Sequence, residues 1–122
     1  MAHEGFHEGP GTLSELTKDY HRIIQSTMEE LEAVDWYNQR AEAANDPSAK
    51  AIMEHNRDEE IEHACMGLEW LRRHSPVWDE MMRKFLFTSG DIIVQEAGGA
   101  GETAQNGPAT PSAGTLNIGK NG

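Results

Sequence analysis

The feature that most limits the fold is a long helical pattern over residues 12–44, which contains neither glycine nor proline. A helix of this length would measure roughly 48 Å. Asp46 and Pro47 then fit the N-cap and first position of a second helix, which we expect to reach about His74. Because the connection is so short, the two helices must run antiparallel. The sequence therefore predicts a hairpin of two long helices.

The N-terminal boundary is marked by Thr12 and Glu15, whose spacing is that of a capping box and predicts Thr12 as the N-cap. Residues 1–11 carry the triplet His-Glu-Gly twice in a glycine-rich context. We expect a flexible polar arm, although its two histidines and two acids could also bind metal loosely.

The second helix is followed by Ser75 and Pro76, which repeat the cap-and-proline signal and predict a short helix over residues 77–88. Residues 91–97 are expected to form a last turn or two. Together these segments predict one all-α domain over residues 12–97.

Beyond this domain the composition changes to small and polar residues, which predicts a flexible linker over residues 98–113. Residues 114–122 differ again, because Leu116 and Ile118 stand at alternate positions between glycines. An extended segment of this pattern could insert both aliphatic side chains into pockets on a partner protein.

Glu60 and His63 form a Glu-x-x-His pair, which places a carboxylate and an imidazole on one helix face. At about 100° per residue, this face also carries apolar or small residues: Met53, Ala64, Gly67 and Leu71. Glu30 faces a similar stripe on the first helix. Inward carboxylates need a compensating cation. Hard oxygen ligands with one imidazole suit iron, manganese or zinc.

The number of ligands predicts a second copy of the chain. Di-iron carboxylate bundles take one glutamate from each of two helices and a Glu-x-x-His pair from each of two others. Glu30, Glu60 and His63 make half of that set, and Glu30 and Glu60 lie at nearly equal depth from the turn. A two-fold homodimer would complete the site, cover the apolar face of the hairpin and form a ferritin-like four-helix bundle.

Composition excludes several partners. The 122 residues carry a net charge of −11, which argues against nucleic acid and anionic membranes as partners and favours cations. With Cys65 as its one cysteine the chain has no internal disulfide, which fits a reducing compartment. We find no pattern of a signal peptide or membrane span, so a soluble cytoplasmic protein is expected.

Four stretches of the two long helices carry a family resemblance: Met28 to Tyr37, His55 to Glu60, Glu62-His63 and Leu68 to Arg73. In these stretches the chain resembles the encapsulated ferritins, over roughly residues 13–95. The resemblance implies an enzyme, a ferroxidase that oxidises Fe²⁺ with O₂ at a di-iron centre on the dimer interface. The matching ligands are Glu30, Glu60 and His63.

The same resemblance implies further site residues. Glu29 and Glu32 match a nearby site through which metal enters, while His55 and Glu59 match outer metal contacts. Trp36 and Tyr37 match aromatic residues beside the centre.

The resemblance also implies partners. It suggests a ring-shaped decamer of five dimers inside the lumen of an encapsulin nanocompartment, where the released iron is stored. Residues 114–120 resemble an encapsulin cargo-loading peptide. Two other interpretations of the residues are a non-catalytic, metal-stabilised helical bundle and a structural cargo protein of the shell.

Overall fold

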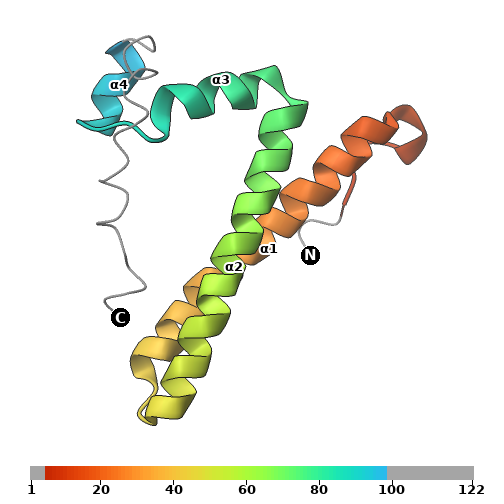
Figure 1. Ribbon diagram of the computed structural model, residues 1–122. Helices are drawn as coiled ribbons and strands as arrows, with labels where there is room; N and C mark the ends of the chain where they lie inside the picture. The colour runs from red at the N-terminus through yellow and green to blue at the C-terminus, as the bar shows by residue number, and fades with distance from the viewer. Residues whose placement is uncertain (1–4, 99–122) are drawn as a thin grey trace. The chain divides into compact units, whose positions relative to one another are not determined.

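The computed structural model describes residues 5–98 (Figure 1). All regular secondary structure in that range is helical. The elements are a 3-10 turn at Pro10–Thr12, α1 (Glu15–Ala43), α2 (Pro47–His74), α3 (Pro76–Phe85) and α4 (Ile92–Gly98). The predicted all-α fold is confirmed. The chain divides into two compact units, the first ending at Leu71 and the second beginning at Arg72.

In the first unit, α1 and α2 lie side by side and antiparallel, as predicted (Figure 1). Two hydrogen bonds define their register. The Lys50 ammonium donates to the Ala41 carbonyl at 3.2 Å near the turn, and the Arg57 guanidinium donates to the Asn38 side chain at 2.9 Å further along. Both bonds connect α1 to α2, and the antiparallel contact that they support contains the site described below.

The turn itself has the predicted caps. Asp46 Oδ2 accepts a hydrogen bond from the Ala49 amide at 2.9 Å, and Pro47 is the first residue of α2. The carboxylate satisfies an amide that has no partner within the helix, while proline has no amide to satisfy. Local chemistry thus ends α1 and starts α2 within three residues.

The predicted N-cap of α1 was wrong by two residues. Ser14, not Thr12, caps the helix, with its hydroxyl accepting from the Thr17 amide at 3.0 Å. The Thr12 hydroxyl instead donates to the Gly9 carbonyl at 2.7 Å and closes the 3-10 turn before the helix. Thr12 and Ser14 both have a hydroxyl group that can cap a helix, and here Thr12 stabilises the preceding 3-10 turn while Ser14 caps α1.

The described part of the N-terminal arm folds back on α1. The ring of Phe6 packs against that of His21, with centroids 5.1 Å apart. The first His-Glu-Gly triplet begins at His3, outside the described residues, so a metal-binding role for the arm stays a prediction.

In the second unit, Ser75 caps α3 by accepting from the Trp78 amide at 3.4 Å, as predicted. Inside α3, Asp79 accepts hydrogen bonds from Arg72 at 2.5 Å and from Arg83 at 3.1 Å. These two guanidinium groups, Arg83 first, lower the pKa of the Asp79 carboxyl. The carboxylate thus connects the end of α2 to α3 and pairs with the following turn of α3.

α3 ends at Phe85, three residues earlier than predicted. Phe87 has φ of 59° and Gly90 has φ of 91°, so the backbone turns in the left-handed region and cannot continue a helix. The Thr88 hydroxyl donates to the Phe85 carbonyl at 2.8 Å and supports the turn. The expected last turns after Gly90 are present as α4. Gly98 apart, the predicted linker and peptide over residues 98–122 lie outside the described residues.

The hairpin has a thin interior. Its fully buried residues are few and mostly small: Thr27, Ala41, Arg57, Ala64 and Leu71. Many larger apolar side chains are exposed instead: Leu16, Met28, Leu31, Trp36, Ile52, Ile61 and Met66. An apolar surface of this extent is characteristic of an interaction site. None of the helices within residues 5–98 is long and apolar enough to cross a membrane.

Candidate metal centre

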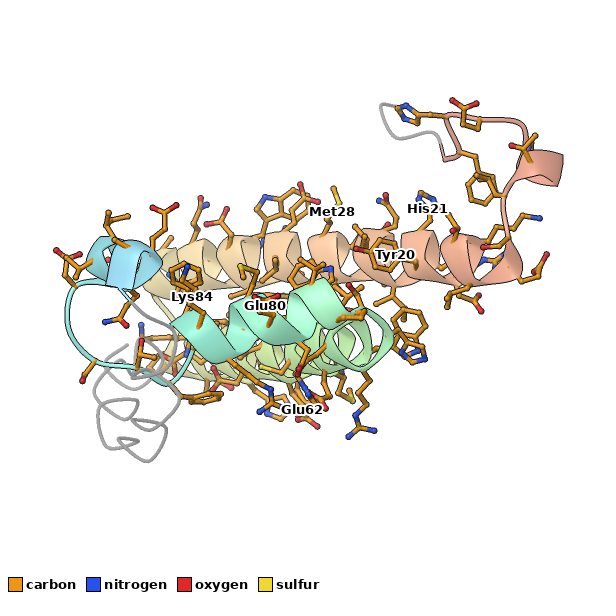
Figure 2. All side chains as sticks on the ribbon, turned by 90° about the horizontal axis from the view of Figure 1, so that it is seen from above. Tyr20, His21, Met28, Glu62, Glu80 and Lys84 are labelled. Atoms are coloured by element: carbon orange, nitrogen blue, oxygen red, sulfur yellow. The ribbon has the colours of Figure 1, made fainter. Side chains whose placement is uncertain are left out.

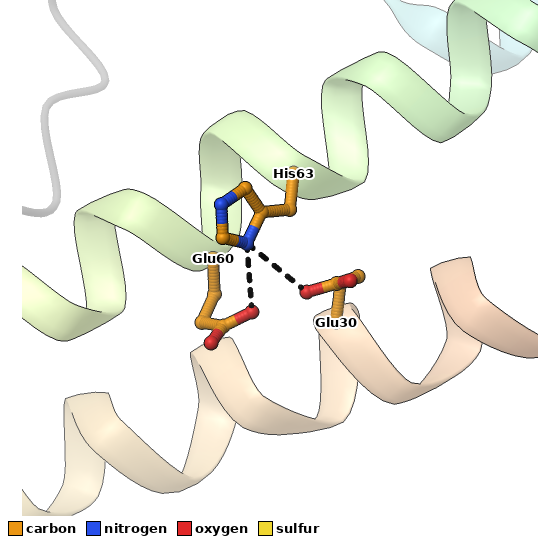
Figure 3. A group of neighbouring side chains, drawn as sticks. All are labelled: Glu30, Glu60 and His63. Atoms are coloured by element: carbon orange, nitrogen blue, oxygen red, sulfur yellow. Dashed lines mark hydrogen bonds and ion pairs between the residues drawn. The ribbon is translucent and has the colours of Figure 1, made fainter.

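Three predicted ligands meet between the two long helices. Glu30 extends from α1, and Glu60 and His63 extend from α2 (Figure 3). His63 Nδ1 lies 3.5 Å from Glu30 Oε1 and 3.4 Å from Glu60 Oε1. One donor atom from each residue lies within 4.8 Å of the others. The structure therefore brings together the three residues on which the metal prediction depends.

The helix geometry explains this arrangement. Glu60 and His63 are three residues apart on α2, so they share a face, and the register of the hairpin places Glu30 opposite them. Their side chains are 24%, 41% and 27% exposed, in the order just given. The cluster therefore lies at the edge of the α1–α2 contact and opens to one side, rather than deep within the apolar stripe.

The three groups shift one another's pKa values in this geometry. The pKa of Glu30 is raised, first by its hydrogen bond with Glu60 and then by desolvation. The same hydrogen bond lowers the pKa of Glu60. A hydrogen bond with Glu60 also raises the pKa of His63. Glu30 is thus the weaker acid of the two carboxyls, and Glu60 is the stronger one.

The donor set fits a divalent transition metal. Two carboxylates supply hard oxygen atoms and negative charge, and an imidazole nitrogen adds the mixed character that iron, manganese and zinc accept. Within residues 5–98, this is the only group of three acidic, histidine or cysteine side chains close enough to hold one ion. Three donors on an open side leave coordination positions for further ligands.

The other four predicted metal residues do not join this cluster within one chain. Glu29 accepts a hydrogen bond from the Gln25 side chain at 3.2 Å. His55 and Glu59 form an exposed pair, with 3.9 Å between His55 Nε2 and Glu59 Oε2. Glu32 is also exposed. Their roles as uptake and outer metal contacts stay predictions.

The two predicted aromatic neighbours lie on α1 beyond Glu30. The Trp36 side chain is exposed, and Tyr37 packs its ring under the Arg40 guanidinium at 5.2 Å. The exposed Trp36 side chain is available to a partner surface.

Arg57 is not among the predicted site residues, although its side chain is only 3% exposed. It donates to Asn38 across the helix contact and to Asp58 Oδ1 at 3.1 Å. The helical spacing could have indicated that Arg57 is buried, because it precedes Glu60 by three residues and so lies on the same face of α2. A buried arginine one turn from the site indicates that the helix pair is also held by polar contacts.

Comparison with known proteins matches residues 5–89 to the family described as EncFtn-like. The encapsulated ferritin-like protein of Rhodospirillum rubrum is 51% identical over 118 residues, covering 93% of this chain and 84% of that protein. The ferritin-like protein of Thermotoga maritima is 48% identical over 99 residues, covering 80% and 87% respectively.

Among solved structures, protein ne0167 from Nitrosomonas europaea superposes with a TM-score of 0.70 at 53% identity. The match covers 73% of this chain and 98% of that one. These comparisons confirm the resemblance first seen in the two long helices. With its helical hairpin and its Glu/His cluster, the chain belongs to the EncFtn-like family.

Proposed function

We propose that this protein is a ferroxidase, which oxidises Fe²⁺ to Fe³⁺ with O₂ at a site shared between two copies of the chain. The observation that carries the proposal is the cluster of Glu30, Glu60 and His63, whose donor atoms lie within 4.8 Å. The names of the encapsulated ferritin-like and ferritin-like relatives support iron as the metal.

Each residue has a separate task in this proposal. Bound metal favours the ionised form of Glu30, whose pKa is otherwise raised, so that both carboxylates offset the charge of the iron. His63 binds through Nδ1, the ring nitrogen that faces both carboxylates. Carboxylates can change their coordination as the iron charge rises, while the imidazole keeps the geometry. Bound Fe²⁺ supplies the electrons that O₂ accepts.

The surroundings favour cation delivery. Exposed acids lie on both helices near the cluster: Glu29, Glu32, Glu59 and Glu62. Glu62 projects outward from α2 (Figure 2). Acidic surfaces raise the local concentration of cations such as Fe²⁺. We assign Glu29 and Glu32 to metal uptake and His55 and Glu59 to outer contacts, as the resemblance implies.

The proposal includes partners. A second copy supplies the other three ligands and covers the exposed apolar side chains of the hairpin. Five such dimers form a ring of ten chains, which has no cavity for mineral. Iron is therefore stored in the lumen of an encapsulin shell, to which residues 114–122 attach the ring.

The test is rapid-mixing measurement of Fe²⁺ oxidation under O₂. Mutating a residue that only hydrogen-bonds to a metal ligand lowers metal affinity or activity by about 10–100-fold. Removing a ligand itself, in Glu60→Ala or His63→Ala, should therefore lower the oxidation rate by more than about 100-fold. Glu42→Ala, an exposed acid on α1, is the matched control and should oxidise at the parent rate. Oxidation that persists in Glu60→Ala would contradict the assignment.

The same assay separates the rival functions. A metal-stabilised bundle would bind Fe²⁺ without oxidising it under O₂, and a purely structural cargo protein would do neither.

A further inference from the structure

Thr27 on α1 and Gly67 on α2 approach each other closely near the metal centre. A Cβ atom added to Gly67 would overlap the Thr27 hydroxyl and lie 3.3 Å from the Thr27 Cβ. Thr27 therefore occupies the space in which a side chain on Gly67 would begin. A larger residue at position 67 therefore requires a shift of the Thr27 side chain, of the two helices, or of both.

The Thr27 hydroxyl is itself unusual. Thr27 is 6% exposed, and its Oγ1 has no hydrogen-bond partner among the residues described. A buried hydroxyl without a partner destabilises a fold, so its hydrogen bonding does not explain this residue. The size of Thr27 explains it instead. Its side chain fills the space that Gly67 leaves open, and an alanine at position 67 would occupy that same space.

This contact lies beside the proposed ligands. Thr27 precedes Glu30 by three residues on α1, and Gly67 follows His63 by four residues on α2, so about one helical turn separates the contact from the cluster. Ala64, next to His63, is also buried. Small residues let helix axes approach to the lower end of the usual 8–10 Å range.

We propose that Thr27 and Gly67 are positioning residues, which set the distance between α1 and α2 so that Glu30 and His63 reach the same metal ion. The inference rests on the proposed metal function. Glu30 alone comes from α1, so a change in helix spacing alters its distance from His63 and leaves the Glu60–His63 pair intact.

The tolerance is small. Metal–ligand bonds to nitrogen and carboxylate oxygen are about 2.0–2.2 Å, so ligand atoms bound to one ion lie roughly 3 Å apart. Glu30 Oε1 and His63 Nδ1 are already 3.5 Å apart in this structure. A shift of about 1 Å between the helices would exceed what this bond length permits without moving both side chains.

The experiment titrates the full chain with Co²⁺ by calorimetry, because Co²⁺ binds such ligands without being consumed by O₂. Gly67→Ala should lower the Co²⁺ affinity by about tenfold or more, the scale of other changes around metal ligands. The double variant Gly67→Ala/Thr27→Ala removes the overlapping hydroxyl and should recover most of that loss. Rescue of this kind distinguishes spacing from general damage.

Two further variants complete the design. Leu71→Ala removes a buried side chain one turn beyond Gly67, so it should lower the melting temperature without changing the Co²⁺ affinity. Thr27→Val keeps the branched shape without the hydroxyl, so it should bind Co²⁺ as the parent does. This variant tests the inference even if Gly67→Ala does not fold.

The outcomes are distinct. If the parent chain binds no Co²⁺, the metal function itself is wrong, and the inference fails with it. If the parent binds Co²⁺ and folded Gly67→Ala binds it equally well, only the spacing role is wrong. A strong loss of affinity in Thr27→Val, or no recovery in the double variant, would also overturn it.

Discussion

Glu30, Glu60 and His63 show how one residue changes the chemistry of another. The hydrogen bond between the two glutamates moves their pKa values in opposite directions, and His63 becomes more basic beside them. The pKa values of Glu30 and His63 are raised in the absence of metal, so a cation at this site would compete with protons for the same side chains.

Metal binding should therefore release protons. The pKa of Glu30 and that of His63, ordinarily 6.5, are both raised, and a protonated imidazole cannot bind metal. We expect the Co²⁺ affinity to be highest above the raised pKa of His63 and to fall as the pH decreases through it.

Calorimetric titration in two buffers with different ionisation enthalpies measures this release. His63→Ala should release fewer protons per ion, and equal heats in both buffers for the parent chain would show that no proton is displaced.

At this scale the sequence predicted the ligand face but not the proton arrangement. Helical periodicity gives the direction of a side chain, which was sufficient for Glu30, Glu60 and His63. It does not give side-chain torsions, so the Glu30–Glu60 hydrogen bond could not be predicted. The overlap at Thr27 was also hidden, because it depends on the separation of two helices.

The contact between the two long helices includes a buried polar side chain as well as apolar packing. Arg57 extends from α2 and donates to Asn38 on α1, while its side chain is almost completely buried. With so few large apolar residues in the interior, this hydrogen bond is an important link between the helices.

Truncation of Arg57 should therefore be costly. Arg57→Ala removes buried packing and leaves the Asn38 oxygen without its donor, which should lower the free energy of unfolding by about 2–3 kcal/mol. Urea unfolding at one fixed protein concentration measures the loss. Arg22→Ala is the matched control, because Arg22 forms only an exposed pair with Asp19, worth at most about 1 kcal/mol. Similar losses in both variants would contradict the role given to Arg57.

The boundaries of the elements were predictable to different degrees. Asp46 and Pro47 combine two strong local signals, and the structure agrees with both. The start of α1 was misplaced because neighbouring hydroxyl residues can each cap a helix. The end of α3 was missed because it depends on the left-handed backbone of Phe87, which a residue of this type rarely adopts.

For the whole molecule, the exposed apolar residues and the half-complete ligand set lead to the same proposal of a homodimer. If acids from two copies gather around one axis, they repel each other until a cation is present. Assembly and metal binding should therefore be coupled.

We expect Co²⁺ to shift the chain towards larger species in sedimentation experiments, and the shift should grow with protein concentration. A Glu30→Ala/Glu60→Ala variant lacks the cluster and should show no such response. Identical sedimentation profiles with and without metal in the parent chain would disprove the coupling.

The proposed attachment to a shell can be tested separately. Deletion of residues 114–122 should leave the rate of Fe²⁺ oxidation unchanged, because the ligands lie on α1 and α2. The truncated chain should no longer co-purify with an encapsulin shell when the two are co-expressed. Retention by the shell at the level of the full chain would rule out this segment as the docking peptide.

The turn at Asp46 has a consequence for how the length of this protein can vary. α1 ends and α2 begins at this turn, so a single residue inserted between positions 47 and 60 would rotate Glu60 and His63 by about 100° around α2 relative to Glu30. The same insertion before Ser14, or beyond His74, would leave the three side chains where they are. Length variation is therefore tolerated at the open ends of the hairpin, and not between its closed end and the ligands.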